Sequence, residues 1–496
     1  MLLMTRTIKN TFAPVNRIPT DVFSLIPEYC DSDKDLIKLT HVCHSWREIF
    51  ISRASLWTSL DCVGPQKTSV YLERSRTSPL KIRLRGWDHS LFHNAAFFLT
   101  LPHLGRLKTL TINGISRSTL GPIEYLGSRA PLLKKLEIHF HDLPIRLTAT
   151  SLFDGNLSSL RKLRLSGVLT NLPWQNLSNL TVFSFCSVPS NTLSITHLLD
   201  FFEGASFLRE IKLEDSLPDS SNAPVGRVVY LPHLRFLRIA AQPGHSILLN
   251  HLHIPTGTLM ILGFRFGDEF SPTPDYFPTP INNLSNISHM TSINLFFGAE
   301  MGMRLKGPSG VLYAFGTRNG VGSIPRNLGD RTLRSLNRLP ISTIERLSIT
   351  GCSFLLRGKS EESGTYQTLL LMNNLRTLTL IDCRNLSFIL ALNPDHNTQN
   401  TMVCPELEEL VLHPNVERNK YWIDGLVEMA GARASNGAKL STIVIVCPRE
   451  AILAEKMFAL KSHVSHVEYR LDPELTRWDA IPGEVNEIDD FEDLAW

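Results

Sequence analysis

One short pattern returns along most of the chain and constrains its fold more than any other feature. Segments such as LGRLKTLTI, LSSLRKLRL and LPHLRFLRI share the form L-x-x-L-x-L, with Ile, Met or Phe as substitutes. Alternating apolar residues predict a β-strand with one buried face in each copy. We take the second apolar residue as the anchor of each copy, and the anchors are Leu110, Leu136, Leu163, Phe183, Ile211, Leu237, Leu262, Ile293, Leu347, Leu378, Leu410 and Ile443.

Most successive anchors lie about 20–33 residues apart, which is enough for one strand and one helix or irregular crossover. Ile293 and Leu347 are twice as far apart, so one copy between them has lost the pattern, and we place its strand at 311–315. A further strand is predicted at 80–87. Helical patterns before two anchors and before a final strand are predicted at 195–202, 421–432 and 451–460, and that strand at 466–471.

These copies resemble leucine-rich repeats. The resemblance implies a curved α/β solenoid with an inner parallel sheet and outer helices, in which each copy buries its strand by stacking on its neighbours. We expect it at residues 63–477, with an irregular insert at about 298–335. Side chains between the anchors are expected to face solvent and to bind a large, extended protein partner. The substrate-facing candidates are Lys162, Arg164, Lys212, Arg238 and Arg346.

This assignment predicts that inward and outward residues of the same strand respond differently to mutation. Leu163→Asp at an inward anchor is expected to unfold the neighbouring copies, because an unpaired buried carboxylate costs several kcal/mol. Arg164→Asp, one residue further on and facing solvent, is expected to leave stability nearly unchanged.

The segment from Ile18 to Leu60 has a different pattern, with apolar residues at helical spacing in three short blocks. Pro19 suits a first helical turn, and the acidic stretch 31–33 supplies an N-cap before the second block. So many large apolar side chains in so short a unit indicate that part of their surface belongs to a partner.

The same segment resembles an F-box, by matches in register at Ile18-Pro19, Val22-Phe23, Asp35-Leu36, Val42-Cys43-x-x-Trp46-Arg47 and Leu56-Trp57-x-x-Leu60. The matches are most like those of fungal F-box proteins. The resemblance implies a three-helix F-box at 14–62, after a flexible leader at 1–13. Pro27 replaces a bulky apolar residue of the family, and we expect it to kink or end the first helix.

What the resemblance implies about function is specific. F-box helices insert into a Skp-type adaptor, which links them to a cullin scaffold. Carried over by motif position, the adaptor-binding residues are Ile18, Pro19, Val22, Leu25, Leu36, Val42, Trp46 and Trp57. An F-box joined to leucine-rich repeats implies the substrate receptor of an SCF-type ubiquitin ligase, with an unidentified protein as substrate. The alternative is a structural F-box protein that binds the adaptor outside any ligase.

No pattern in the sequence predicts catalysis, so we expect no enzyme, no metal and no cofactor. Residues 353–360 end like a phosphate-binding loop, but Ser353 replaces the glycine that such a loop needs. His41, Cys43 and His44 lack a fourth metal ligand.

The composition argues against nucleic-acid binding and a membrane span, and it indicates a cellular compartment. A net charge of +3 is too small for a general nucleic-acid binder, and no apolar run approaches a membrane span. Eight scattered cysteines and no signal peptide predict reduced thiols in the cytoplasm or nucleus. Residues 478–496 form an acidic tail with interleaved apolar residues. It is either solvated or lies along the basic inner face of the solenoid.

Overall fold

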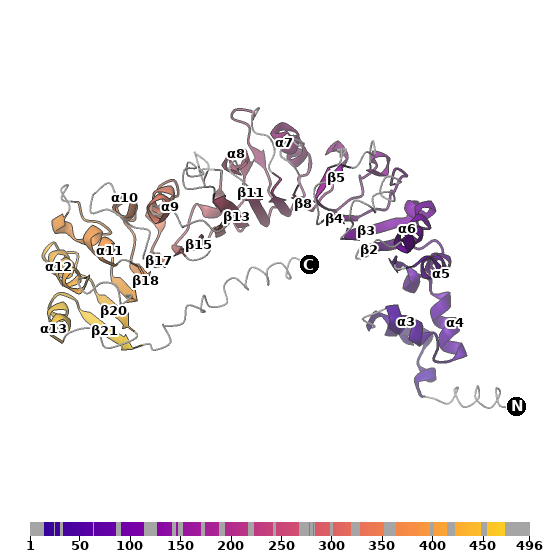
Figure 1. Ribbon diagram of the computed structural model, residues 1–496, viewed down its shortest axis with the longest axis horizontal. Helices are drawn as coiled ribbons and strands as arrows, with labels where there is room; N and C mark the ends of the chain where they lie inside the picture. The colour runs from indigo at the N-terminus through magenta and orange to yellow at the C-terminus, as the bar shows by residue number, and fades with distance from the viewer. Residues whose placement is uncertain are drawn as a thin grey trace. The chain divides into compact units, whose positions relative to one another are not determined.

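Figure 1 shows the computed structural model of the chain, which divides into two compact units, Met1–Asn222 and Ala223–Trp496. The structure describes residues 14–23, 25–29, 33–62, 64–85, 91–113, 126–140, 145–146, 152–169, 174–187, 194–216, 223–241, 245–266, 277, 281, 283–297, 301–318, 328–351, 364–383, 385–396, 401–413, 422–447 and 454–471. The predicted leader, the loop at 353–360 and the acidic tail lie outside these residues.

The first unit begins with several short helices rather than the three helices that the resemblance implies. They are η1 (Pro14–Arg17), α2 (Thr20–Phe23), η2 (Ile26–Tyr29), α3 (Asp33–Leu39), α4 (His44–Ser52) and η3 (Ala54–Trp57). The expectation for Pro27 is confirmed: α2 ends at Phe23 and Pro27 lies in a separate 3-10 turn. A proline has no N–H to donate and its ring blocks the preceding turn, so a continuous α-helix cannot run through it.

A parallel sheet follows in the same unit, with its strands side by side in chain order. They are β1 (Ser59–Asp61), β2 (Leu80–Arg85), β3 (Leu107–Asn113), β4 (Lys135–His139), β6 (Lys162–Ser166), β8 (Val182–Cys186) and β9 (Glu210–Glu214). The predicted anchors stand in register across it, from Leu110 through Leu136, Leu163 and Phe183 to Ile211, and each is buried.

Helices and tight turns connect these strands. They are α5 (Pro65–Ser75), α6 (Leu91–Phe98), η4 (Leu101–Arg106), η7 (Leu152–Gly155), η8 (Trp174–Asn176) and α7 (Ile195–Gly204), with a small pair of strands, β5 (Ile145–Arg146) and β7 (Val168–Leu169). The predicted helix at 195–202 is therefore confirmed. Phe201 and Phe202 of α7 pack against Phe183 of β8, so this helix covers the inward face of the sheet.

The second unit is built on a mostly parallel sheet. Its strands are β11 (Phe236–Ala241), β13 (Leu259–Phe266), β14 (Ser292–Phe297), β15 (Met301–Gly307), β16 (Gly310–Arg318), β17 (Arg346–Thr350), β18 (Thr377–Ile381), β19 (Glu409–His413), β20 (Thr442–Cys447) and β21 (His466–Leu471), beside a small pair, β10 (Val229–Tyr230) and β12 (Leu252–His253). Anchors from Ile293 to Ile443 are buried and aligned across β14, β17, β18, β19 and β20.

Helices and turns of this unit are α8 (His245–Asn250), η10 (Ser285–Ile287), α9 (Leu328–Leu336), η11 (Ile341–Thr343), α10 (Gly364–Leu371), α11 (Asn385–Leu392), η12 (Pro394–His396), α12 (Trp422–Ser435) and α13 (Ala454–His463). Figure 1 shows α10 to α13 in a row along one side of the strands from β17 to β21. The helices predicted at 421–432 and 451–460 and the strand at 466–471 are confirmed as α12, α13 and β21.

The region where the sequence pattern is lost departs from the parallel order of the other strands. A strand does occupy 311–315, but it belongs to an antiparallel hairpin, β15–β16, which places the strands in the order β13, β16, β15, β14, β17. One anchor is also misplaced by the sequence pattern. Leu237 aligns with Met260, and Leu262 aligns with Ile239, one pleat further on. Both residues face inward, so alternation alone could not choose between them.

Candidate functional site

Four of the predicted adaptor-binding residues have large exposed apolar side chains on the N-terminal helices. Ile18, Val22, Leu25 and Val42 keep between 37% and 57% of their surface exposed, and Pro19 beside Ile18 is exposed too. Tyr29, which sequence reasoning did not select, is the most exposed large apolar residue of this region. We call the set Ile18, Val22, Leu25, Tyr29 and Val42 the N-terminal apolar surface.

The side chains of the N-terminal apolar surface stay exposed because other residues of the same short helices form the interior. Trp46 and Phe50 of α4 form a small core with their rings edge to face, 5.9 Å apart. The partly buried side chains around them are Ile26, Leu39, Cys43, Ile49 and Leu56. Leu36 of α3 is also buried. Trp46 and Leu36, predicted to contact an adaptor, are therefore interior residues of the chain, and they support the surface instead of forming it.

Trp57, another predicted adaptor-binding residue, has no exposed surface. Its indole N–H donates to the Phe50 carbonyl oxygen at 2.9 Å, and its ring meets the edge of Tyr71 from α5 at 5.0 Å. The Arg74 guanidinium lies 4.4 Å above the same ring. Trp57 thus joins the N-terminal helices to α5. The sequence pattern could not separate this role from an adaptor contact, because the partners in α5 lie beyond the motif.

The substrate-facing candidates of the first unit lie on the predicted side of the sheet, but two of them do not point freely to solvent. Arg164 of β6 is 8% exposed, with its guanidinium 3.6 Å from a Glu137 carboxylate oxygen and 3.3 Å from one of Glu210. Lys135 and Lys212 complete the set, at 2.9 Å from Glu137 and 3.7 Å from Glu210. We call these five residues the charged cluster.

The charged cluster explains why Arg164 is buried, although the sequence pattern predicts that it faces solvent. Ser184 on β8 is small enough for Arg164 to reach across that strand to Glu210 on β9. The Thr111 hydroxyl donates to Glu137 Oε2 at 3.2 Å, the oxygen that Lys135 also contacts. Two carboxylates therefore offset two of the three positive charges here, and Glu137 was visible in the segment LLKKLEI at the position of an outward side chain.

The other three candidates differ in exposure. Lys162 of β6 is half-buried and has no ion-pair partner among the described residues. Arg238 of β11 is half-buried, and Arg346 at the start of β17 is exposed. All three stand at positions that alternate with buried anchors, so they lie on the side of the strands away from the leucines.

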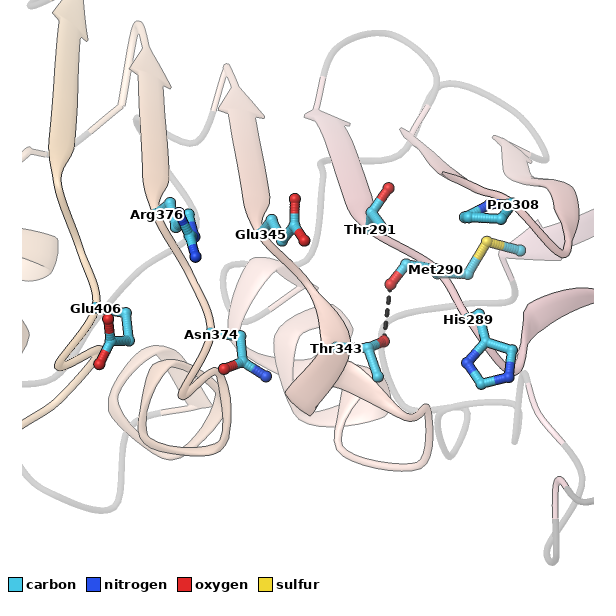
Figure 2. A pocket seen from close by; sticks show the side chains of 9 residues that line it. All are labelled: His289, Met290, Thr291, Pro308, Thr343, Glu345, Asn374, Arg376 and Glu406. Atoms are coloured by element: carbon cyan, nitrogen blue, oxygen red, sulfur yellow. Dashed lines mark hydrogen bonds between the residues drawn. The ribbon is translucent and has the colours of Figure 1, made fainter.

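A polar pocket of about 490 Å³ opens where strands β14, β17, β18 and β19 begin. Figure 2 shows its lining, which consists of His289, Met290, Thr291, Pro308, Thr343, Glu345, Asn374, Arg376 and Glu406. The Thr343 hydroxyl donates to the Met290 carbonyl oxygen at 2.7 Å. Because the charged residues of this lining are exposed, the pocket offers polar contacts and not a desolvated reaction site.

The described residues contain no arrangement that indicates covalent or metal chemistry. No group of three His, Cys, Asp or Glu side chains among them is placed to hold a metal ion. Cys43, Cys62 and Cys404 are free thiols. Burial raises the pKa of Cys62 and of Cys404 to about 12, so neither is a thiolate near neutral pH. None of the described helices is long and apolar enough to cross a membrane.

The comparison with protein families finds one match, an F-box-like domain at residues 15–63. This segment contains the whole N-terminal apolar surface and the core of Trp46 and Phe50. A search of curated proteins finds no match to the chain. The F-box-like domain fits binding to an adaptor, and F-box domains generally bind adaptors of the Skp type.

Proposed function

We propose that this chain is the substrate-recognition subunit of an SCF-type ubiquitin ligase. In this role the F-box-like domain binds a Skp-type adaptor and, through it, a cullin. The remainder acts as a leucine-rich-repeat solenoid that holds the protein to be ubiquitinated. The transfer chemistry belongs to other subunits, so the chain itself is no enzyme. We place its work in the cytoplasm or nucleus.

The observation that carries the proposal is the N-terminal apolar surface. Burying Val22 and Val42, which are both more than half exposed, removes apolar area from water and favours association by about 25 cal/mol per Å². Contacts of this kind, with apolar side chains from short helices seated in a groove, are typical of helix recognition by a partner. The core of Trp46 and Phe50 keeps these side chains outside.

Aligned anchors support the repeat assignment for the remainder. A ladder of buried apolar residues in register is what stacking of neighbouring repeats requires, because no single repeat covers its own strand. The antiparallel hairpin β15–β16 is an insertion within that pattern, and the parallel order resumes with β14 and β17.

The test uses the full chain with Val22→Asp and Val42→Asp combined, and a purified Skp-type adaptor. A charge at each position leaves the interior untouched but places a carboxylate in the contact, which we expect to weaken binding by about 30-fold or more. Leu132→Asp is the matched control, because Leu132 is similarly exposed and lies outside the F-box-like domain. Unchanged affinity in the double variant, with unchanged circular dichroism, contradicts adaptor binding by this surface.

Purifying the chain from cells together with its bound proteins distinguishes a ligase receptor from a structural F-box protein. A cullin that is recovered with the adaptor supports the receptor role, whereas adaptor without cullin favours a structural F-box protein. Trp46→Ala is not used as a probe of adaptor binding, because removing an aromatic side chain from the core is expected to destabilise the domain by about 3–5 kcal/mol.

A further inference from the structure

In each unit the strands have a face opposite the leucines, and the charged residues on these two faces differ. In the first unit, basic residues alternate with Glu137 and Glu210 in the charged cluster. In the second unit, strands β11, β13, β14, β15, β16, β17 and β18 contain no Asp or Glu at any position. Their outward basic side chains whose surroundings are described are Arg238, Arg304, Lys306 and Arg346. This face therefore carries positive charge that its own strands do not balance.

The strand register arranges these residues in rows. One row runs from Phe236 and Leu259 through Val311 to Lys306, Ser292 and Arg346. Its first three members are half-buried apolar side chains, and its two cations are exposed. The antiparallel hairpin creates this contrast, because it places Lys306 of β15 between the apolar β16 and the polar start of β14.

Two further rows add aromatic surface beside the cations. The Arg304 guanidinium lies 5.2 Å from the ring centre of Tyr313, to which it is paired across β15 and β16. In the next row, Phe315 and Phe296 are both half-buried and flank Gly302. A Cβ at Gly302 would collide with the Phe296 ring, so the ring lies over this glycine on the outward face. We call the outward side of β11, β13, β16, β15, β14 and β17 the cationic–aromatic face.

Lys306 and Arg346 are the cations best placed to meet a ligand. Both are exposed, and neither has an ion-pair partner among the described residues. They stand two strands apart, or about 10 Å at a spacing of about 4.8 Å per strand. Glu345 precedes Arg346 but lines the polar pocket at the edge of the sheet. An extended chain advances about 3.3 Å per residue and its side chains alternate between two faces, so carboxylates two or four residues apart lie on one side and bracket the separation of these two cations.

We propose that the cationic–aromatic face binds an extended protein segment that presents both Asp or Glu and large apolar side chains on the same side. The six strands span about 24 Å, which corresponds to about seven residues of extended chain. Carboxylates meet Lys306 and Arg346, while apolar side chains cover Leu259, Val311 and Phe315. The inference rests on the proposed receptor function and names the chemistry of the segment that the receptor holds.

Protein fits this face better than nucleic acid does. Aliphatic residues lie between the aromatic rings, and they complement apolar side chains more closely than they complement stacked bases. Few cations are present, whereas a surface that follows a phosphate backbone distributes basic residues along its whole length.

The experiment measures fluorescence anisotropy of a labelled synthetic peptide, EIDDFEDLAW, on the full chain. This is the sequence of residues 487–496, which has the proposed chemistry. We expect a Kd of about 100 μM or tighter that weakens with added salt. Combining Lys306→Glu with Arg346→Glu is expected to weaken binding by about tenfold or more. The matched control is Lys439→Glu with Lys461→Glu, which makes the same charge change at two exposed lysines away from these strands.

A second peptide tests the apolar half of the proposal. It carries Ser in place of Ile488, Phe491, Leu494 and Trp496, and we expect it to bind at least about tenfold more weakly. Equal binding of the two peptides, equal losses in the two protein variants, or no binding at all overturns the proposal. Tighter binding of a single-stranded oligothymidine through Lys306 and Arg346 overturns it in favour of a nucleic acid.

Two measurements separate the remaining outcomes. Peptide binding that appears only after residues 487–496 are removed shows that the chain's own segment occupies the face, and this overturns docking of a partner. Adaptor affinity, measured on the same preparations, is expected to stay at the wild-type level in Lys306→Glu/Arg346→Glu. If Lys306→Glu/Arg346→Glu loses peptide binding but keeps adaptor binding, the result supports the peptide site and does not affect the proposed function. The adaptor affinity of Val22→Asp/Val42→Asp tests the proposed function and not the peptide site.

Discussion

Arg164→Asp is the sharpest test of the structure, because sequence and structure give opposite expectations for it. The alternating pattern makes Arg164 an outward residue whose change is harmless. In the structure its guanidinium lies between Glu137 and Glu210 and is 8% exposed. Asp at this position removes two ion pairs and leaves three carboxylates together.

The magnitude follows from these contacts. Removing one partner of a buried ion pair costs about 3–5 kcal/mol, because the other charge stays buried without compensation. Two carboxylates about 5 Å apart repel by about 3 kcal/mol at an effective dielectric constant of about 20. Lys135 and Lys212 reduce this cost, so we expect a loss of at least about 4 kcal/mol. For a unit of this size, that lowers the unfolding temperature by about 8–16 °C.

The assay is thermal and urea unfolding followed by circular dichroism, with Lys162→Asp as the control. Lys162 lies on the same strand and the same side but outside the charged cluster, so its change is expected to cost less than about 1 kcal/mol. Arg164→Met combined with Glu137→Gln and Glu210→Gln is expected to recover part of the stability, because no buried carboxylate is left without a partner, while Lys135 and Lys212 lose theirs but are more exposed. An Arg164→Asp chain within about 1 kcal/mol of wild type refutes the buried cluster.

Two other predictions follow from local geometry. Gly351→Ala is expected to destabilise the second unit by about 1–3 kcal/mol in urea unfolding, because Gly351 has a φ of +77° and a Cβ there meets the Phe297 carbonyl oxygen. Gly127→Ala, with open space around it, is the control, and equal effects of the two changes contradict the assignment. Cys62 and Cys404 are expected to resist iodoacetamide at pH 8.5 in the folded chain and to react in urea, as measured by mass spectrometry. Burial raises the pKa of each thiol to about 12, so the reactive thiolate forms only as the pH rises toward that value, and rapid labelling of the folded chain disproves this.

The sequence by itself determined the local elements of this protein. Strands lie at the repeated anchors, and anchors such as Leu110 and Leu378 are buried, because alternation along a strand fixes which side chains share a face. The end of the first helix could be predicted from Pro27 alone, because proline has no N–H to donate and its ring blocks the preceding turn. The F-box-like segment was also recognisable, since its signal is confined to about fifty neighbouring residues.

Only the tertiary structure decided which of these elements meet. The order of β14, β15 and β16, the alignment of Leu237 with Met260, and the burial of Trp57 under α5 all depend on pairing between separate segments. Within the charged cluster, Arg164 and Glu210 interact although they lie 46 residues apart in the chain. Whether a residue between two leucines reaches solvent depends on the charges and sizes of the side chains on neighbouring strands. For that reason a pattern read along one strand predicted the side on which Arg164 lies but not its burial.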